Sequence, residues 1–195
     1  MKVPVIDNGG QWTHREYRVL RDLGAESRIV PNSTPLADLD ADGIVLSGGA
    51  LSLEGSAELG AVGDWVDRVG VPVLGICVGH QFLARHFGGR VAKSASPEFG
   101  RVDLSVDGID HPLFARLPPR LQVWASHNDS VVEPPPGWAI LAHSAACPVQ
   151  AMAHPEKPIW GVQFHPEVEH TEGGREILSN FLDLCRRNPT GPERR

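Results

Sequence analysis

Short apolar runs alternate with longer amphipathic segments through the first half of the chain. The runs are rich in Val, Ile and Leu and short enough for buried strands; they lie at Val3–Ile6, Glu26–Val30, Gly43–Leu46 and Val71–Ile76. Segments with apolar residues at helical spacing follow three of them, at Trp12–Leu23, Glu58–Val69 and Val78–Phe87, and a short helix at Thr34–Leu39 follows the other. Such alternation is typical of a parallel sheet covered by helices. We therefore expect an α/β fold with a doubly wound, mostly parallel central sheet flanked by helices.

The second half of the chain carries a different pattern. Between residues 89 and 162 the apolar segments are brief, β-branched and separated by Pro or Gly, at Val102–Val106, Leu121–Trp124, Val131–Val132, Trp138–Ala142, Val149–Ala153 and Ile159–Val162. These segments predict hairpins and further strands of the sheet. A closing amphipathic helix is expected at Gly173–Arg186, with Ile177, Leu178, Phe181, Leu182 and Cys185 facing inward. We expect one domain over residues 1–187 and a polar, disordered tail at residues 188–195.

Composition excludes several classes of protein. The chain has 195 residues, 41% of them hydrophobic, and a net charge of −6, which excludes a disordered chain and does not favour nucleic acid or an anionic membrane as a partner. No apolar run approaches the roughly 20 residues that cross a bilayer. The three cysteines, Cys77, Cys147 and Cys185, are too few and odd in number for a disulfide framework. We therefore expect a cytoplasmic protein with reduced thiols.

A cysteine stands between two glycines where a predicted buried strand turns into a helix. The segment reads Val73-Leu74-Gly75-Ile76-Cys77-Val78-Gly79-His80-Gln81. The arrangement is that of a nucleophile elbow with Cys in place of Ser, and glycines permit the strained, crowded backbone of so sharp a turn. A helix N-terminus also favours the thiolate. The alternative is a small apolar core residue, but the flanking glycines favour Cys77 as a nucleophile.

The best candidate for a base lies in Gly161-Val162-Gln163-Phe164-His165-Pro166-Glu167. An apolar strand ends at His165, and Glu167, two residues further in an extended segment, points to the same side. Glu167 can therefore orient His165 as the third member of a triad. A metal site on residues 165–170 and a run of ordinary surface polar residues are the alternatives. Pro166 and the absence of helical His-Glu-x-x-His spacing argue against the metal, and we expect none.

A pair of glycines follows the third predicted strand, in Leu46-Ser47-Gly48-Gly49-Ala50. Exposed backbone N–H groups at such a pair can stabilise an oxyanion or hold a phosphate, and the pair can also form a plain turn. Neither Gly-x-x-x-x-Gly-Lys-Ser/Thr nor Gly-x-Gly-x-x-Gly occurs in the chain, so nucleotide binding is unsupported. These residues alone do not decide between an oxyanion site and a plain turn.

Together and in this order, the three segments resemble those of the class I, or triad, glutamine amidotransferases. That family combines an SGGP-type oxyanion strand, a GxCxGxQ elbow and an FHPE base motif. The matching residues are Ser47-Gly48-Gly49, Gly75-Ile76-Cys77-Val78-Gly79-His80-Gln81 and Phe164-His165-Pro166-Glu167. The resemblance extends over residues 1–187. Ala50 departs from it, because the family has proline there, and we expect a looser oxyanion loop.

The resemblance implies amide hydrolysis through a thioester. Cys77 is expected to attack the side-chain amide carbon of glutamine, while the backbone N–H groups of Gly49 and Val78 bind the oxyanion. His165, oriented by Glu167, is expected to protonate the departing ammonia and then to activate water.

The resemblance also implies how the substrate is held and which partner uses the ammonia. Gln81 and the backbone near Ser126 and His127 are expected to hold the glutamine. No cofactor is expected in this chain. No ATP-pyrophosphatase domain follows, so we expect the amination to occur on another polypeptide, an ATP-pyrophosphatase subunit that uses Mg-ATP.

Within the family, further segments resemble the free-standing glutaminase subunits of archaeal-type GMP synthases. They include Asn8-Gly9-Gly10-Gln11, Val123-Trp124-Ala125-Ser126-His127-Asn128-Asp129 and His165-Pro166-Glu167-Val168-Glu169-His170-Thr171. The last two favour a GMP synthase, in which xanthosine monophosphate is adenylated on the partner, over the glutaminase of anthranilate synthase. An unrelated cysteine hydrolase and a non-catalytic, flavodoxin-like binding module are the remaining alternatives.

Overall fold

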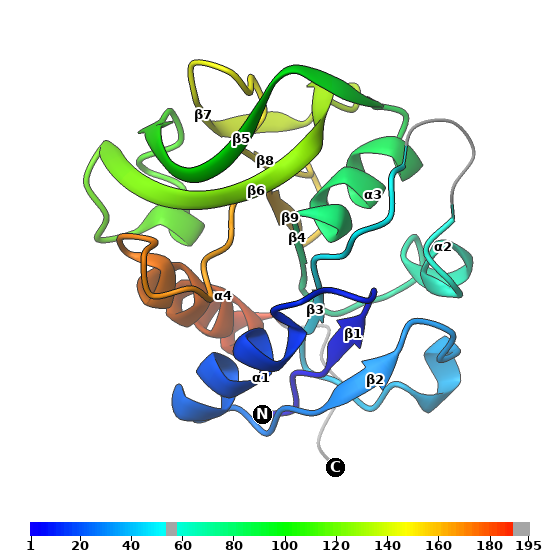
Figure 1. The fold of residues 1–195 in the computed structure, drawn as a ribbon. Helices are drawn as coiled ribbons and strands as arrows, with labels where there is room; N and C mark the ends of the chain where they lie inside the picture. Colours follow the sequence, from blue (N-terminus) through cyan, green and yellow to red (C-terminus); the bar gives the residue numbers. More distant parts are fainter. Residues whose placement is uncertain (54–57, 189–195) are drawn as a thin grey trace.

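The computed structural model describes residues 1–53 and 58–188, and its strands form a nine-stranded sheet in the order β2-β1-β3-β4-β9-β8-β7-β5-β6 (Figure 1). The first five strands in this order pair in parallel. They are β2 (Ile29–Pro31), β1 (Val5–Asp7), β3 (Ile44–Leu46), β4 (Val73–Ile76) and β9 (Ile159–Val162). The α/β fold with a mostly parallel, doubly wound part is therefore confirmed, and each of the four predicted N-terminal strands overlaps an observed one.

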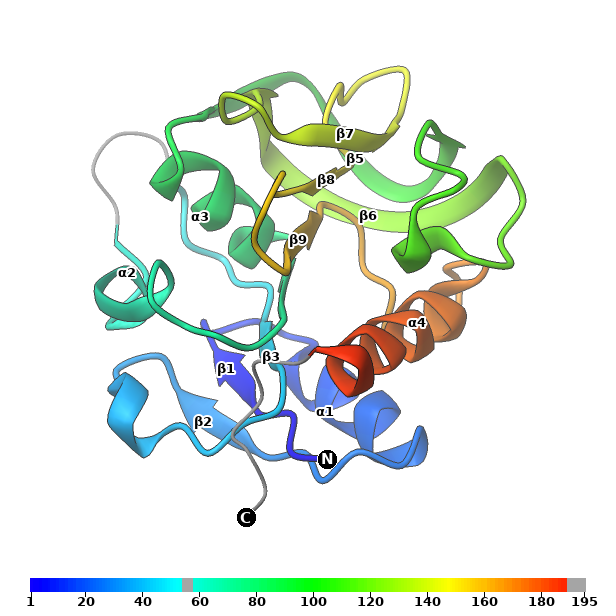
Figure 2. The same ribbon diagram turned by 180° about the vertical axis from the view of Figure 1, so that it is seen from behind.

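Helices cover both faces of the parallel strands, as the two opposite views show (Figures 1 and 2). One face packs against α1 (Thr13–Asp22) and α4 (Gly174–Arg187), and the other against α2 (Val62–Trp65) and α3 (Val78–His86). Short 3-10 turns lie at η1 (Leu36–Asp38) and η2 (Pro112–Phe114). Adjacent strand residues enter opposite cores: Leu74 joins the cluster with Phe181 of α4, whereas Val73 joins the cluster with Phe82 of α3. Two apolar cores thus fix the sheet between its helices.

The helix expected over Glu58–Val69 is much shorter than predicted. The α-helical residues are only Val62–Trp65. Gly60 has a left-handed φ of +56°, and a Cβ atom there would lie 2.6 Å from the Asn32 carbonyl oxygen. The chain therefore turns tightly against Asn32 before the helix begins, although Leu59 and Val66 are buried as the spacing predicts.

The antiparallel part of the sheet departs from the brief segments that were expected. It consists of β8 (Ala151–Ala153), β7 (Ala139–His143), β5 (Arg90–Val106) and β6 (Arg120–Glu133). The last two are 17 and 14 residues long and curve side by side across the molecule (Figure 1). The β5–β6 register shifts between Lys93 and Glu98, so an irregularity accommodates Pro97 without ending the strand.

The C-terminal helix closes the described fold. All five residues predicted to face inward on α4 are buried. The helix ends at Arg187, and Asn188 then donates a hydrogen bond from Nδ2 to the Gly70 carbonyl oxygen at 2.9 Å. The remainder of the tail that the sequence predicts, residues 189–195, lies outside the described residues. Within the described ranges, no helix has the length and apolar character needed to cross a membrane.

Candidate active site

Cys77 occupies the sharp turn between β4 and α3. Its backbone has φ 50° and ψ −103°, a conformation that costs a non-glycine residue about 1–3 kcal/mol and is concentrated at functional sites. A Cβ atom on Gly75 would lie 2.6 Å from the Gly79 backbone, and one on Gly79 would lie 2.5 Å from the Leu46 carbonyl oxygen. Both glycines are therefore required by close backbone approach, and the turn predicted from the sequence is present.

The pairing of β4 with β9 brings His165 to the same place. Ile76 pairs with Val162, and the Cys77 N–H continues the ladder by donating to the Val162 carbonyl oxygen at 2.9 Å. His165 follows three residues later, and its own N–H donates to the carbonyl oxygen of Trp124 on β6 at 2.9 Å. Two adjacent parallel strands and one distant strand thus place the cysteine and the histidine together.

Glu167 holds the His165 imidazole. Nδ1 of His165 donates to Oε1 of Glu167 at 2.7 Å, and neither side chain is more than 5% exposed. Burial lowers the pKa of His165, but the Glu167 carboxylate and the hydrogen bond with Cys77 outweigh it and raise the pKa to about 10. The Trp12 ring packs against the imidazole in a T-shaped arrangement, with 4.4 Å between the ring centroids. The arrangement keeps a proton on His165 beside the Cys77 sulfur.

The glycine loop after β3 lies directly over this pair. A Cβ atom on Gly48 would lie 3.2 Å from Cε1 of His165 and 3.6 Å from Cβ of Cys77. Gly49 and Val78 both line the cavity that contains Cys77. Val78 is the first residue of α3, where backbone N–H groups have no intrahelical partner. The two residues whose backbone N–H groups are expected to bind an oxyanion therefore line the same cavity as the cysteine, and that role stays a prediction.

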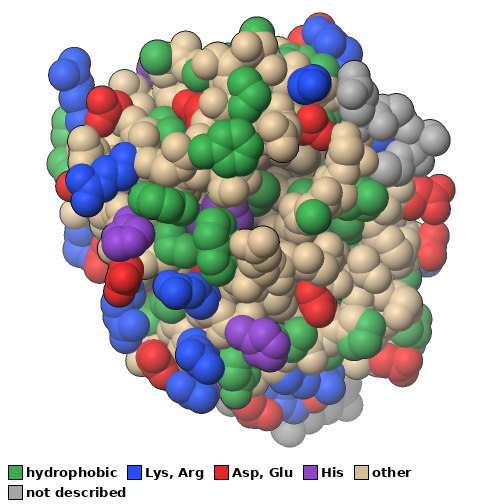
Figure 3. All heavy atoms as spheres, in the orientation of Figure 1, with side chains coloured by type: hydrophobic (Ala, Val, Ile, Leu, Met, Phe, Trp, Pro, Cys, Tyr) green, Lys and Arg blue, Asp and Glu red, His purple; other side chains and the backbone are tan. Residues whose placement is uncertain are grey.

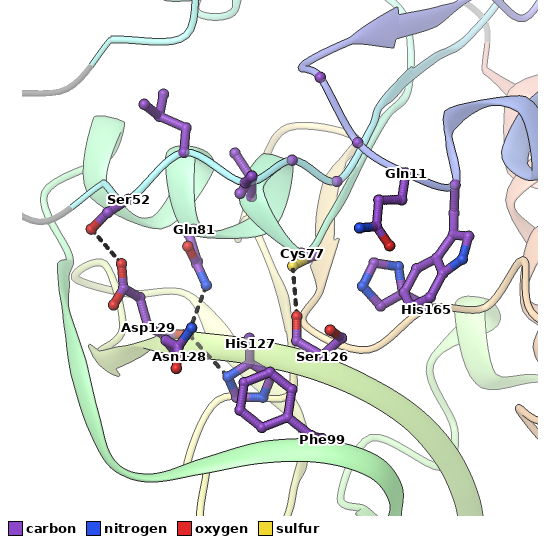
Figure 4. A pocket seen from close by; sticks show the side chains of 18 of the residues that line it. Gln11, Ser52, Cys77, Gln81, Phe99, Ser126, His127, Asn128, Asp129 and His165 are labelled. Carbon is purple, nitrogen blue, oxygen red and sulfur yellow. Dashed lines mark hydrogen bonds between the residues drawn. The ribbon is translucent and has the colours of Figure 1, made fainter.

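A cavity of about 330 Å³ gathers the residues singled out in the sequence (Figure 4). Of the eight predicted site residues, seven line it: Gly49, Cys77, Val78, Gln81, Ser126, His127 and His165. Glu167 stands behind His165 and does not line it. Gln81 is fixed at the wall because its Nε2 donates to the Asp129 carbonyl oxygen at 2.7 Å and to Oε1 of Gln163 at 3.1 Å.

The side chain of His127 is used within the protein. Its Nε2 lies 2.9 Å from Oε2 of Glu98, and its Nδ1 lies 3.0 Å from the Asp129 carbonyl oxygen. Both ring nitrogens therefore contact oxygen atoms of the protein. His127 therefore anchors the wall of the cavity, and the expectation that its backbone contacts the substrate stays a prediction.

A group of potential metal ligands lies behind that wall. The ligand atoms of Glu98, His127 and Cys147 lie within 4.8 Å of one another, and this is the one such group among the described residues. Glu98 already accepts hydrogen bonds from His127, Ser144 and Gln150. Burial raises the pKa of the Cys147 thiol to about 12. Because its members already satisfy one another, we interpret the group as a buried hydrogen-bond network.

Two polar residues at the site were not predicted from the sequence. Gln163 donates from Nε2 to the Cys77 sulfur at 3.6 Å, and Glu16 of α1 accepts a hydrogen bond from the Gly48 N–H at 3.2 Å. Glu16 lies four residues after Trp12 and four before Leu20, on the apolar stripe of its helix, and a charged residue in that position is the signal that could have revealed it. No spacing distinguished Gln163.

The chain belongs to the class-I glutamine amidotransferase family, whose family model matches residues 4–185. The family resemblance of the three motifs is therefore confirmed. Among individual relatives, the chain is 49% identical over 187 residues to a glutamine-hydrolyzing GMP synthase subunit of Thermoplasma acidophilum, covering 95% of this chain and 93% of the relative. It is 48% identical over 186 residues to the subunit of the same name from Pyrococcus abyssi, covering 94% of this chain and 98% of the relative.

Solved structures agree with this placement. A crystal structure of a putative GMP synthase subunit from Thermoplasma acidophilum superimposes with a TM-score of 0.88 at 48% identity, over 95% of this chain and 94% of that one. A glutamine amidotransferase from Thermotoga maritima shares the fold with a TM-score of 0.73 at 19% identity, over 95% and 96% of the two chains.

Proposed function

We propose that this chain is the glutamine-hydrolysing subunit of a two-subunit GMP synthase of the cytoplasm. It supplies ammonia to a separate ATP-pyrophosphatase subunit, which adenylates XMP with Mg-ATP and converts it to GMP. The observation that carries the proposal is the buried His165–Glu167 pair beside Cys77 at the strand-to-helix turn. The relatives named above, 48–49% identical over nearly the whole chain, support this particular synthase.

Glutamine enters the cavity with its carboxamide toward Cys77. The carbonyl oxygen is placed between the Gly49 and Val78 N–H groups, where donors aimed at a developing oxyanion contribute about 2.7–4 kcal/mol each. Gln81 and the backbone near Ser126 hold the rest of the substrate. A cavity of about 330 Å³ suits a ligand as small as an amino acid.

The first half of the reaction forms the thioester. The Cys77 thiolate attacks the carboxamide carbon, a C–S bond forms, and the carbonyl electron pair moves to the oxygen. The His165 imidazolium then gives its proton to the amide nitrogen, the C–N bond breaks, and ammonia leaves. Glu167 keeps the ring oriented through the 2.7 Å hydrogen bond at Nδ1.

The second half releases glutamate. Neutral His165 accepts a proton from water, the oxygen of that water attacks the thioester carbon, and the C–S bond breaks to restore the Cys77 thiolate. Glutamine and water are thereby converted to glutamate and ammonia. These steps use residues of this chain and assign it no metal or cofactor; Mg-ATP belongs to the partner subunit.

The rim of the cavity has exposed apolar side chains, which favours the proposal that a partner subunit binds there. Phe99 is 63% exposed and Leu51 is 45% exposed, and both line the cavity. Hydrophobic side chains also gather near the centre of the face of the molecule shown in Figure 3. Next to Leu51 the oxyanion loop carries Ala50, and we propose that docking of the partner orders this loop and raises a low basal activity.

The test is glutamate release by the chain alone and by the chain reconstituted with the ATP-pyrophosphatase subunit, ATP and XMP, together with GMP formation. Low basal release, a strong increase in the pair and glutamine-dependent GMP formation are expected. Equal release with and without the partner would refute activation by docking. Stimulation by an anthranilate synthase subunit would assign a different synthase, and no glutamine hydrolysis even with the partner would leave the unrelated cysteine hydrolase.

A further inference from the structure

A buried carboxyl group on α1 lies beside the triad and takes no part in the steps above. Glu16 is 1% exposed and lines the cavity. Its Oε1 accepts the hydrogen bond from the Gly48 N–H at 3.2 Å, whereas its Oε2 is buried without a hydrogen-bond partner. Because a buried, unpartnered polar atom is costly, its presence beside the reacting groups calls for a reason.

Glu16 is one of three side chains that grip the start of the oxyanion loop. The peptide between Ser47 and Gly48 is held on its carbonyl side by Nδ2 of Asn8 at 2.9 Å and on its N–H side by Glu16. In the next peptide, the Gly48 carbonyl oxygen accepts from the Ser47 hydroxyl at 2.8 Å. The N–H of that planar peptide is the N–H of Gly49. Contacts that hold the Ser47–Gly48 and Gly48–Gly49 peptides therefore set the direction of the Gly49 N–H, the expected oxyanion donor.

The surroundings of Glu16 disfavour its ionised form. Glu167 and His165 of the triad and Asp7 at the end of β1 are the charged groups that act on it. Burial first, and then the charge of Glu167, raise the pKa of Glu16 well above its ordinary value, outweighing the opposing effects of the Gly48 hydrogen bond and of His165. A neutral acid still offers Gly48 a carbonyl acceptor, and it places no second anion beside Glu167.

We propose that Glu16 is a positioning residue that carries a proton at neutral pH and holds the Ser47–Gly48 peptide so that the Gly49 N–H points at the oxyanion. Glu16 touches no reacting atom and acts only through the loop. The proposal rests on the proposed glutamine hydrolysis at this site, and it explains why a carboxyl group occupies the apolar face of α1.

The first experiment compares two substitutions in the full chain. Glu16→Met removes the acceptor, so kcat for glutamine hydrolysis is expected to fall about 10- to 100-fold with KM within about threefold, since a small misplacement of a catalytic donor is enough for such losses. Glu16→Gln keeps a neutral acceptor and is expected to restore kcat to within about threefold of wild type. His14→Met, at an exposed position of the same helix, is the matched control.

Two further readouts separate loop positioning from general damage. Alkylation of Cys77 by iodoacetamide uses no oxyanion donor, so its rate is expected to be unchanged in Glu16→Met. Thermal unfolding is expected to show only a small loss of stability, because Glu16→Met leaves the Gly48 N–H without its acceptor but also removes the buried, unpartnered Oε2. Wild-type kcat in Glu16→Met would overturn the positioning role, and so would a fall in alkylation that matches the fall in kcat.

The protonation state is measured directly and without activity. In protein labelled with ¹³C at the glutamate carboxyl carbons, the resonance that disappears in Glu16→Gln belongs to Glu16. At pH 7 that resonance is expected at the position of a protonated carboxyl group. A resonance at the ionised position, or a Glu16→Gln variant as impaired as Glu16→Met, would overturn the neutral acid. A wild-type chain that hydrolyses no glutamine even with the partner subunit, ATP and XMP would instead overturn the proposed function, and the resonance would still decide the charge of Glu16.

Discussion

Acid should destabilise this protein through a histidine that catalysis does not use. His80, the residue before Gln81 on α3, is completely buried, and its Nε2 donates to the Val149 carbonyl oxygen at 3.1 Å. Its Nδ1 lies against β9, where a Cβ atom on Gly161 would be only 2.5 Å away. Burial lowers the pKa of His80 from 6.5 to about 3, and the nearby His127 adds to the effect. The folded protein therefore keeps this imidazole neutral.

The magnitude follows from proton linkage. Between pH 6.5 and 3 the unfolded chain binds a proton at His80 and the folded chain does not, so the free energy of unfolding falls as the pH falls. One pKa unit corresponds to about 1.4 kcal/mol, and lowering the pH from 7 to 5 should cost about 2 kcal/mol through this residue alone.

Urea unfolding at pH 7 and pH 5 measures the effect. We compare wild type with His80→Gln, whose amide can still donate to Val149 but does not titrate, and with His14→Gln at an exposed position as the control. His80→Gln is expected to lose about 2 kcal/mol less than wild type between the two pH values, and His14→Gln to behave as wild type. An identical pH dependence in wild type and His80→Gln would show that the buried imidazole is not the sensitive group.

Two further predictions concern the triad. A glutamine-analogue diazoketone should label Cys77 alone, because burial raises the pKa of Cys147 and of Cys185 to about 12. Peptide mapping by mass spectrometry checks this prediction, and a label on another cysteine would contradict it. His165→Ala should abolish nearly all glutamine hydrolysis, whereas Glu167→Gln should retain part of it and move the alkaline limb of the kcat/KM profile to lower pH, since the carboxylate raises the pKa of His165. An unmoved alkaline limb in Glu167→Gln would disprove that electrostatic role.

Features encoded within one segment could be predicted from the sequence. The strand-to-helix turn at Cys77 depends on Gly75 and Gly79, which are its neighbours in sequence and also the residues that the turn brings into contact. The inward stripe of α4 is likewise a property of one continuous segment, and all five of its predicted residues are buried. Local pattern is sufficient in such cases, because the contacts that matter lie within the pattern itself.

Features that depend on distant contacts could not be predicted in the same way. Gly60 delays the start of the expected helix because the chain packs there against Asn32. The strands β5 and β6 continue through sequence breaks such as Pro97 because each strand supports the other along most of its length. Glu16 enters the site because α1 packs beneath a loop more than 30 residues further along the chain. Each of these outcomes is decided by a neighbour that no local pattern identifies.

The boundary between the parallel and antiparallel strands also divides the residues of the site by the part of the sheet from which they come. Cys77 and His165 follow strands buried at the centre of the sheet, whereas Phe99 and Ser126 of the cavity wall come from β5 and β6, one continuous stretch that joins the rest of the sheet through β7 alone. Substitutions or insertions in the stretch from β5 to β6 can therefore change the shape of the cavity wall. They can also change the surface that a partner would contact at the rim of the cavity. The catalytic residues would tolerate such changes as long as the Trp124 backbone of β6, whose carbonyl oxygen accepts a hydrogen bond from the His165 N–H, keeps its position.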